Sequence, residues 1–439
     1  MRLGPFGGLA LVLAGCFGKP GFSGKPGDGG GEAVDVPPFT PLVPVSVTGN
    51  GLTDPIVVTG QDVMIDFPKT GIRMPDQLQV GGTEILGESM QCGHENKIGV
   101  GVYPSYTATS GPTWPTAYAP TSTPSVTAKG PAFVQVAIAW NGKFDCTGTA
   151  PAPTASGTST FTLFPDGRLV RHDTLATGAL LPANTSCGCL PPTSDYFATS
   201  FLAVQGAPFT TLLYSAGTAT SPLTLPASDT WIDDPNPRWA CLATPNARRL
   251  AVAWPGTVTS VLGASNDGGT RVALDGAGTL ITFLFDWIYD HTTVPDMQLE
   301  TYSAWFFAAD VRAHCDATAM ATLFSDYTDP RRLSIAADGR NAFADLDPTT
   351  GLYRIVPAET ATAATYTVIV ESGNAGVSGG FALSLPFATG ATPVVQLDSM
   401  TLVENRDFLV QHDAGTPIVH TLWFKDPLPQ GHVLTLHQP

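Results

Sequence analysis

The stretch "STFTLFPDGRLVRHDTL" (residues 159–175) has two apolar runs on either side of "PDG" at 165–167. Proline presets the φ angle of a turn, and glycine adopts the positive φ that many turns need, so this stretch predicts a β-hairpin. Alternation along the second run places Arg171 and Asp173 on one face of a strand and His172 on the other. We therefore expect an Arg171–Asp173 pair on the surface, with His172 exposed or hydrogen-bonded elsewhere.

The same alternation recurs outward from this hairpin in both directions. In "AFVQVAIAW" (132–140) every second residue from Val134 to Trp140 is large and apolar. In "LITFLFDWIYD" (280–290) the large apolar positions are Ile281, Phe283, Phe285, Trp287 and Tyr289. A period of 2 indicates strands buried on one face, and we expect "TYSAWFFAADV" (301–311) to pair with the 280–290 strand. The Pro-, Ser- and Thr-rich stretch at 103–131 is interpreted as a long surface loop.

One segment has a helical pattern instead. In "DATAMATLFSDYTDP" (316–330) apolar residues follow a helical stripe, Asp316 can cap its start, and Pro330 ends it. Short strand patterns resume beyond it and continue to the end of the chain. The predicted fold is therefore mainly β: a large antiparallel β-sandwich domain over 39–315, with room for subdivision, a short helical joint over 316–330, and a smaller C-terminal β-sandwich over 331–439.

The first 16 residues, "MRLGPFGGLALVLAGC", have one early positive charge, an apolar run and small residues before Cys16. This layout is typical of a secretory signal peptide over 1–15. Its last four residues, Leu13-Ala14-Gly15-Cys16, resemble the lipobox of bacterial lipoproteins. That resemblance implies cleavage before Cys16 and acylation of the cysteine. The alternative is an ordinary signal peptide that happens to end in a cysteine.

The segment after Cys16 fits an anchored protein. Residues 17–38 are nearly all Gly, Pro and charged, so 16–38 is predicted to be a lipidated cysteine followed by a flexible tether. The resemblance implies a location in the bacterial cell envelope, on the extracytoplasmic side of a membrane, with the outer membrane favoured. The membrane is then a partner through the lipid alone. A net charge of −16 argues against nucleic acid as a partner.

Six cysteines remain once Cys16 is assigned to lipid. They are Cys92, Cys146, Cys187, Cys189, Cys241 and Cys315. An even number in an exported protein favours disulfides, whose pairing the sequence leaves open. Cys187 and Cys189 are separated by one residue, unlike the redox motif C-x-x-C, and no second close pair completes a zinc site. Structural bridges are therefore preferred over zinc, redox chemistry or free thiols.

No common catalytic motif occurs in the sequence, so no catalytic residue, metal or cofactor is predicted. Asn266, Asp267 and Asp275 lie near glycines but lack the spacing of a calcium loop. Aromatic rings beside carboxylates and hydrogen-bonding groups suit sugars, which makes the 280–310 strands the candidate glycan site. Its expected residues are Trp287, Tyr289, Asp290, His291, Tyr302 and Trp305. The alternative is that these rings belong to the core.

The hairpin at 159–175 and the long antiparallel strands resemble large β-sandwich domains of the galactose-mutarotase-like type. That superfamily occurs in carbohydrate-processing proteins, and the resemblance assigns no catalytic residue here. Three functions from different classes follow. The favoured one is a non-catalytic, lipid-anchored envelope protein that binds a glycan or another extracellular partner. The alternatives are a polysaccharide-processing enzyme (a lyase or glycosidase) and a structural envelope component.

Overall fold

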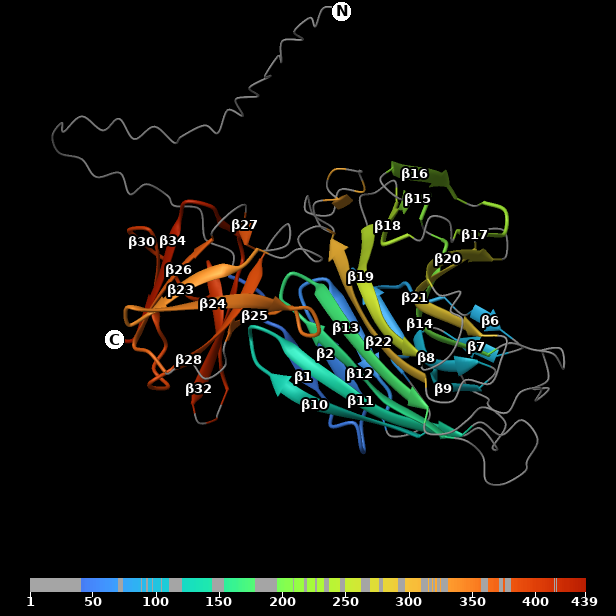
Figure 1. Ribbon diagram of the computed structural model, residues 1–439, viewed down its shortest axis with the longest axis horizontal. Helices are drawn as coiled ribbons and strands as arrows, with labels where there is room; N and C mark the ends of the chain where they lie inside the picture. Colours follow the sequence, from blue (N-terminus) through green and yellow to red (C-terminus); the bar gives the residue numbers. More distant parts are fainter. Residues whose placement is uncertain are drawn as a thin grey trace, which may run out of the picture. The chain divides into compact units, whose positions relative to one another are not determined.

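In the computed structural model, burial alternates along many of the described strands, which places their apolar side chains on one face of a sheet. Figure 1 shows the strands of these sheets. Residues 40–439 form one compact unit. The structure describes residues 41–69, 74–87, 89–91, 94–96, 98–103, 105–109, 121–143, 154–177, 196–207, 209–216, 219–225, 227–232, 237–244, 249–261, 269–275, 279–290, 297–308, 315, 318, 320–321, 324, 331–356, 362–370, 374–375, 380–413, 415 and 417–439.

Three antiparallel sheets come from the chain before residue 309. The five-stranded sheet has the order β1 (Ser46–Thr48), β2 (Ile56–Thr59), β3 (Val63–Phe67), β4 (Gln77–Val80) and β5 (Thr83–Glu84). The nine-stranded sheet has the order β10 (Thr121–Lys129), β11 (Val134–Lys143), β12 (Thr154–Leu163), β13 (Arg168–Thr177), β22 (Met297–Ala308), β19 (Arg249–Val261), β18 (Trp239–Ala243), β15 (Thr211–Ala216) and β16 (Ala219–Thr224). The six-stranded sheet has the order β17 (Thr230–Ile232), β20 (Gly269–Asp275), β21 (Leu280–Asp290), β14 (Tyr196–Gln205), β8 (Ile98–Tyr103) and β9 (Ser105–Thr109). A separate hairpin joins β6 (Ser89–Gln91) and β7 (His94–Asn96).

These three sheets share one apolar cluster, the first core, which includes Phe67, Phe161, Leu169, Trp254 and Phe283. Trp254 of the nine-stranded sheet and Phe283 of the six-stranded sheet have ring centroids 6.1 Å apart. Phe67 of the five-stranded sheet meets Phe161 edge-on at 5.3 Å. The first core therefore lies between stacked sheets, as in a β-sandwich.

The C-terminal strands form a ten-stranded sheet. Its order is β30 (Met400–Thr401), β29 (Val394–Leu397), β34 (Val433–His437), β26 (Thr365–Val370), β23 (Leu333–Ala337), β24 (Arg340–Asp347), β25 (Leu352–Val356), β28 (Phe381–Phe387), β32 (Ile418–Phe424) and β31 (Phe408–Asp413). A two-stranded ribbon of β27 (Asn374–Ala375) and β33 (Leu428–Pro429) accompanies it. Val395 near one edge and Val410 at the other belong to the same apolar cluster, the second core, with Ile335 and Leu383. The sheet therefore curls around its own core.

A third apolar cluster joins the two sheet systems. This junction cluster consists of Ala132, Phe133, Phe164, Val170, Leu213, Trp239, Cys241, Ala251, Ala253, Met320, Leu352, Ala382, Leu409 and Trp423. Hydrogen bonds also join the two parts here: the amide N–H of Phe133 donates to Gln411 Oε1 at 3.4 Å, and the amide N–H of Leu42 donates to the Asn405 carbonyl at 2.8 Å. The nine-stranded sheet thus has an inner face on the first core and an outer face that meets the C-terminal sheet.

The mainly β class is confirmed, and so is the hairpin at 159–175. β12 and β13 pair antiparallel, and Gly167 in the turn has φ of +80°. The alternation predicted for Val134 and Ile138 is confirmed, since both are buried in the first core. The division into domains at 39–315 and 331–439 stays a prediction.

Two local expectations need correction. Residues 103–131 are not one long loop, because they contain β9 and β10; Pro124 fits a strand because β10 is the edge of its sheet. The predicted helix over 316–330 is not established. Thr318, Met320, Ala321 and Phe324 have helical backbone geometry, but no helix with defined ends occurs in the described part of the chain.

Candidate functional site

The aromatic site expected in the 280–310 strands is divided between two sheets. β21 pairs with β14 and β20 in the six-stranded sheet, whereas β22 pairs with β13 and β19 in the nine-stranded sheet. The expected pairing of the 280–290 and 301–311 segments is therefore wrong. Trp287, Tyr289 and Asp290 belong to one layer of the sandwich, and Tyr302 and Trp305 belong to another.

A β-bulge also changes which positions of β21 share a face. Phe283 is the cross-strand partner of Leu202, and both lie in the first core. The register then shifts by one residue, so that Trp287 is the partner of Thr199. An extra residue in one strand reverses its later alternation relative to its partner. The backbone positions of Trp287 and Tyr289 thus face away from Phe283, contrary to the single apolar face that the sequence suggests.

The side chains of these aromatic candidates, and the whole of His291, lie outside the described residues. Their role in ligand binding stays a prediction. The backbone register does give Tyr302 a new neighbour, because it is the cross-strand partner of His172. Glu300 pairs with Thr174 two residues further along. His172 and Thr174 lie on the face of β13 opposite to Leu169, which belongs to the first core. These two residues and the backbone positions of their partners therefore belong to the outer face of the nine-stranded sheet.

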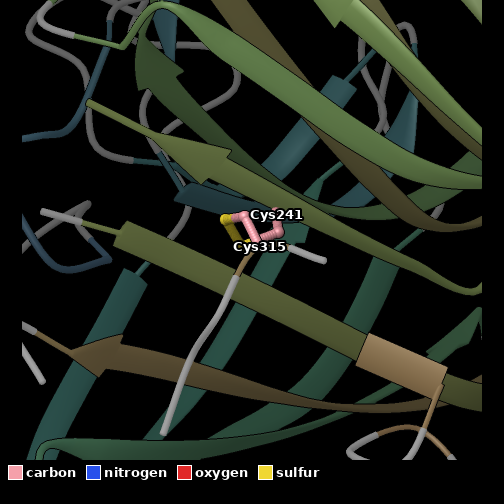
Figure 2. The surroundings of a disulfide bond; sticks show 2 residues. All are labelled: Cys241 and Cys315. Carbon is pink, nitrogen blue, oxygen red and sulfur yellow. A yellow bond between two sulfur atoms is a disulfide. The ribbon is translucent and has the colours of Figure 1, made fainter. Parts of the chain in front are cut away.

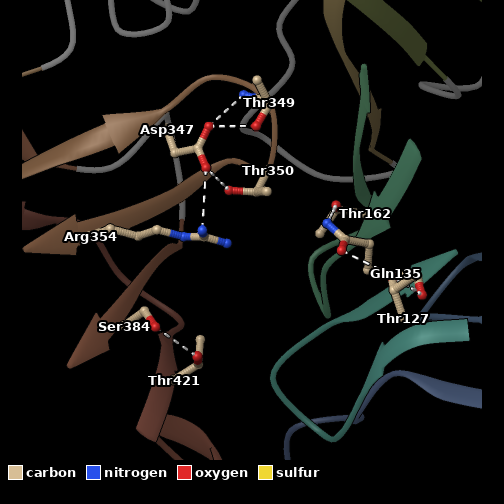
Figure 3. Close-up of polar contacts among 9 residues, drawn as sticks. All are labelled: Thr127, Gln135, Thr162, Asp347, Thr349, Thr350, Arg354, Ser384 and Thr421. Carbon is tan, nitrogen blue, oxygen red and sulfur yellow. Dashed lines mark hydrogen bonds and ion pairs between the residues drawn. The ribbon is translucent and has the colours of Figure 1, made fainter. Parts of the chain in front are cut away.

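The outer face next to His172 is rich in hydroxyl and amide groups. We call Thr127, Gln135, Thr158, Thr160, Thr162, His172 and Thr174 the outer polar strip. Thr127 is exposed and Thr162 is buried, and the other members are half-buried. Figure 3 shows Gln135 between two threonines: Thr127 Oγ1 donates to Gln135 Oε1 at 2.9 Å, and Gln135 Nε2 donates to Thr162 Oγ1 at 3.0 Å. Side chains of this kind both donate and accept, as sugar hydroxyls require.

A turn of the ten-stranded sheet borders the outer face at the junction cluster. Asp347 organises this turn by accepting hydrogen bonds from Thr349 Oγ1 at 2.6 Å and Thr350 Oγ1 at 2.9 Å (Figure 3). Gly351, with φ of +74°, follows it and packs against the nine-stranded sheet: a Cβ added there would lie 2.8 Å from Val170 Cγ2. Val170 and His172 project from the same face of β13, so the outer polar strip begins where the junction cluster ends.

The Arg171–Asp173 pair exists, but it is not on the surface. Arg171 Nε lies 2.8 Å from an Asp173 carboxylate oxygen, and the two side chains are 0% and 1% exposed. Their shared face is the inner face, because it also carries Leu169 of the first core. Burial lowers the pKa of Arg171, an effect that the neighbouring Asp173 charge opposes. A structural ion pair inside the sandwich replaces the expected surface pair.

A histidine pair lies in the C-terminal sheet. The Nε2–H of His420 donates to the Thr389 carbonyl at 3.0 Å, which leaves its Nδ1 as an acceptor 3.2 Å from His412 Nδ1. His420 is 0% exposed. Burial lowers its pKa, and the hydrogen bond to Thr389 opposes that shift. Sequence analysis did not predict this pair, because the two residues meet only through the pairing of β31 with β32.

A disulfide joins Cys241 in β18 to Cys315 (Figure 2). Bridging is confirmed for these two cysteines. Cys92, Cys146, Cys187 and Cys189 lie outside the described residues, so their bridges stay a prediction. Among the residues that the structure describes, no group of three or more metal-binding side chains is found. The described part also contains no helix that is long and apolar enough to cross a membrane.

No family of known proteins matches the sequence, and no curated protein is detectably similar to it. Solved structures with distant similarity include a beta-arabinopyranosidase, at 9% identity and a TM-score of 0.29, where the match covers 58% of this chain and 40% of that one. Another is the heparan sulfate lyase HepC from Pedobacter heparinus, at 6% identity and a TM-score of 0.29, with 73% and 42% covered. This chain therefore matches less than half the length of either protein. Similarity at this level supports no inference about activity.

Proposed function

We propose that this protein is a lipid-anchored component of the bacterial cell envelope that binds a glycan without turning it over. The observation that carries the proposal is the outer polar strip, where hydroxyl, amide and imidazole groups from four adjacent strands share one face. Such groups exchange hydrogen bonds with sugar hydroxyls, and strands fix their spacing. The anchor rests on the sequence at 13–16. The Cys241–Cys315 disulfide supports an oxidising location outside the cytoplasm.

A second candidate function is a polysaccharide-processing enzyme. It is favoured by the register that makes Tyr302 the cross-strand partner of His172, with Glu300 two residues away on the same face. Histidine, tyrosine and glutamate are all side chains that can transfer protons in catalysis. A structural envelope component, which would neither bind nor cleave glycans, is the third possibility that the experiment below separates.

The test is a glycan array probed with the full-length protein purified in detergent. Wild type is expected to bind a defined set of glycans, and a Thr160→Val/His172→Phe variant is expected to lose affinity by about tenfold, as roughly two hydrogen bonds are removed. Thr367→Val, which alters a half-buried threonine on β26 of the other sheet, is the matched control and should bind normally. Cleavage of the bound glycans, detected as new chain ends, would favour the polysaccharide-processing enzyme. Absence of all binding would refute the proposal.

Anchoring is tested in the same preparation. Cys16→Ser is expected to release the protein from membranes into the soluble fraction, because a signal peptide without its lipidated cysteine leaves no anchor. Retention of the variant in salt-washed membranes would contradict the lipid anchor and leave the glycan test unaffected.

A further inference from the structure

Arg168, the first residue of β13, is a buried cation. It is 2% exposed, and its guanidinium carbon lies 4.1 Å from the centroid of the Phe164 ring. Its Nε and Nη2 atoms are fully buried, and neither has a hydrogen-bond partner among the described residues. A buried donor without an acceptor is costly, and a charged donor more so. Something that accepts hydrogen bonds is therefore expected beside these two atoms.

The identity of the two atoms specifies the chemistry of that acceptor. Nε and Nη2 form one edge of the guanidinium, which presents two parallel N–H groups to the two oxygens of a carboxylate. Arg332 shows this arrangement in the same chain, with Nε 2.7 Å from Asp345 Oδ1 and Nη2 3.0 Å from Asp345 Oδ2. Arg406 uses the same edge toward Asp407. Both of those arginines are substantially exposed, at 54% and 44%. Arg168 is buried, and the same edge of its guanidinium has no hydrogen-bond partner among the described residues.

A second buried donor lies in the same region. The indole N–H of Trp423 has no partner among the described residues, and Trp423 is 3% exposed. Trp423 and Phe164, on which Arg168 stacks, are both members of the junction cluster. Two donors without acceptors in or beside one apolar cluster are an independent sign that the junction accommodates a hydrogen-bond acceptor.

We propose that the Nε/Nη2 edge of Arg168 binds a carboxylate at the junction of the nine-stranded and ten-stranded sheets. The carboxylate comes either from a small free acid or from a uronate unit of a glycan. The second source is compatible with the outer polar strip, because Arg168, Val170 and His172 project from the same face of β13. The site does not depend on the glycan proposal, since a free acid would bind without it.

The experiment measures binding of sodium acetate, sodium glucuronate and an oligoglucuronate to the full-length protein by calorimetry and thermal unfolding. Sodium chloride at equal ionic strength and neutral glucose are the reference solutes. Wild type should show saturable, carboxylate-specific binding and a raised Tm. Arg168→Met should abolish both effects, and Arg168→Lys, which keeps the charge but lacks the edge, should weaken binding by about tenfold. Arg332→Met, whose edge is already filled by Asp345, should behave as wild type.

The pattern of binding identifies the source. Similar binding of acetate and glucuronate supports a small free acid, and binding of the oligoglucuronate alone supports a glycan. No difference between the carboxylates and chloride in wild type would overturn the proposal, as would unchanged binding by a folded Arg168→Met variant. The wild-type titrations keep the test decisive if that variant does not fold. Loss of oligoglucuronate binding in Thr160→Val/His172→Phe with acetate binding intact would separate this site from the outer polar strip.

Discussion

The nine-stranded and ten-stranded sheets differ in whether their charged side chains are buried or exposed. The described ion pairs of the ten-stranded sheet, such as Arg332–Asp345, are at the surface, with these side chains 54% and 37% exposed. In the nine-stranded sheet, Arg171 and Asp173 are 0% and 1% exposed, and Arg168 is 2% exposed. Removing charges from water costs free energy that a buried pair recovers only in part. Among the described residues, the nine-stranded sheet therefore carries costly buried charges, whereas the ion pairs of the ten-stranded sheet stay in contact with water.

The largest loss of stability that would test this contrast between buried and exposed charges is expected from a change at Asp173. Replacing Asp173 with Ala leaves Arg171 charged and buried, so the free energy of unfolding should fall by about 3–5 kcal/mol. Asp345→Ala is the matched control at an exposed pair and should cost about 0–1 kcal/mol. Urea unfolding measures both values.

The double variant Arg171→Met/Asp173→Leu sharpens the same comparison. It removes both charges and keeps an apolar filling of the first core, so it should recover most of the stability lost in Asp173→Ala. Similar losses for Asp173→Ala and Asp345→Ala would show that burial does not distinguish the two pairs.

A smaller effect is expected where the two sheets meet. Gly351 and Gly339 both have positive φ, at +74° and +81°, but only Gly351 lies against Val170; a Cβ at Gly339 meets nothing within 4 Å. Alanine therefore strains the backbone at both positions, but crowds the nine-stranded sheet only at Gly351. Gly351→Ala should lower the free energy of unfolding by about 1–3 kcal/mol more than Gly339→Ala. Equal losses in thermal or urea unfolding would mean that the turn does not pack on the junction cluster.

The smallest effect concerns His420 and depends on pH. Burial lowers its pKa in the folded protein, so below the unfolded value of about 6.5 the unfolded chain binds a proton that the folded chain does not. Stability should therefore fall as the pH decreases from above 6.5, and this contribution should level off once the pH is below the folded pKa. His420→Gln keeps a donor toward Thr389 and does not titrate. Its loss of stability between pH 7.5 and 5.5 should be smaller than that of wild type in urea unfolding; equal losses would contradict this account.

Local patterns in the sequence predicted strands well and predicted the partners of those strands poorly. Turn residues at 165–167 were enough to predict the β12–β13 hairpin, because β12 and β13 are adjacent in sequence as well as in the sheet. β21 and β22 are also adjacent in sequence, yet they enter different sheets. A short connection between strands is compatible with a hairpin or with a crossing between two layers, and only contacts distant in sequence distinguish them.

The candidate site shows the same limit. Alternation correctly put Arg171 and Asp173 on one face, but it could not show that this face was the interior one. A bulge in β21 reversed the face of Trp287, and no local residue pattern indicated it. His172 and Tyr302 become neighbours only through the pairing of β13 with β22, which joins segments far apart in the chain. Arg168 was not singled out from the sequence, because arginine is usually exposed and its burial follows from the packing of the folded chain.

The disulfide between Cys241 and Cys315 has a mechanical consequence when the chain is pulled from its two ends. The bond closes a loop with a sequence separation of 74 residues, and β19, β20, β21 and β22 all lie inside it. A pull applied between the two ends of the chain would pass through the two sulfur atoms and bypass that loop. An extended chain spans roughly 3.3–3.6 Å per residue, so the bond withholds roughly 250 Å of extension. The segment that contains β19, β20, β21 and β22 would stay a closed loop while the rest of the chain was extended.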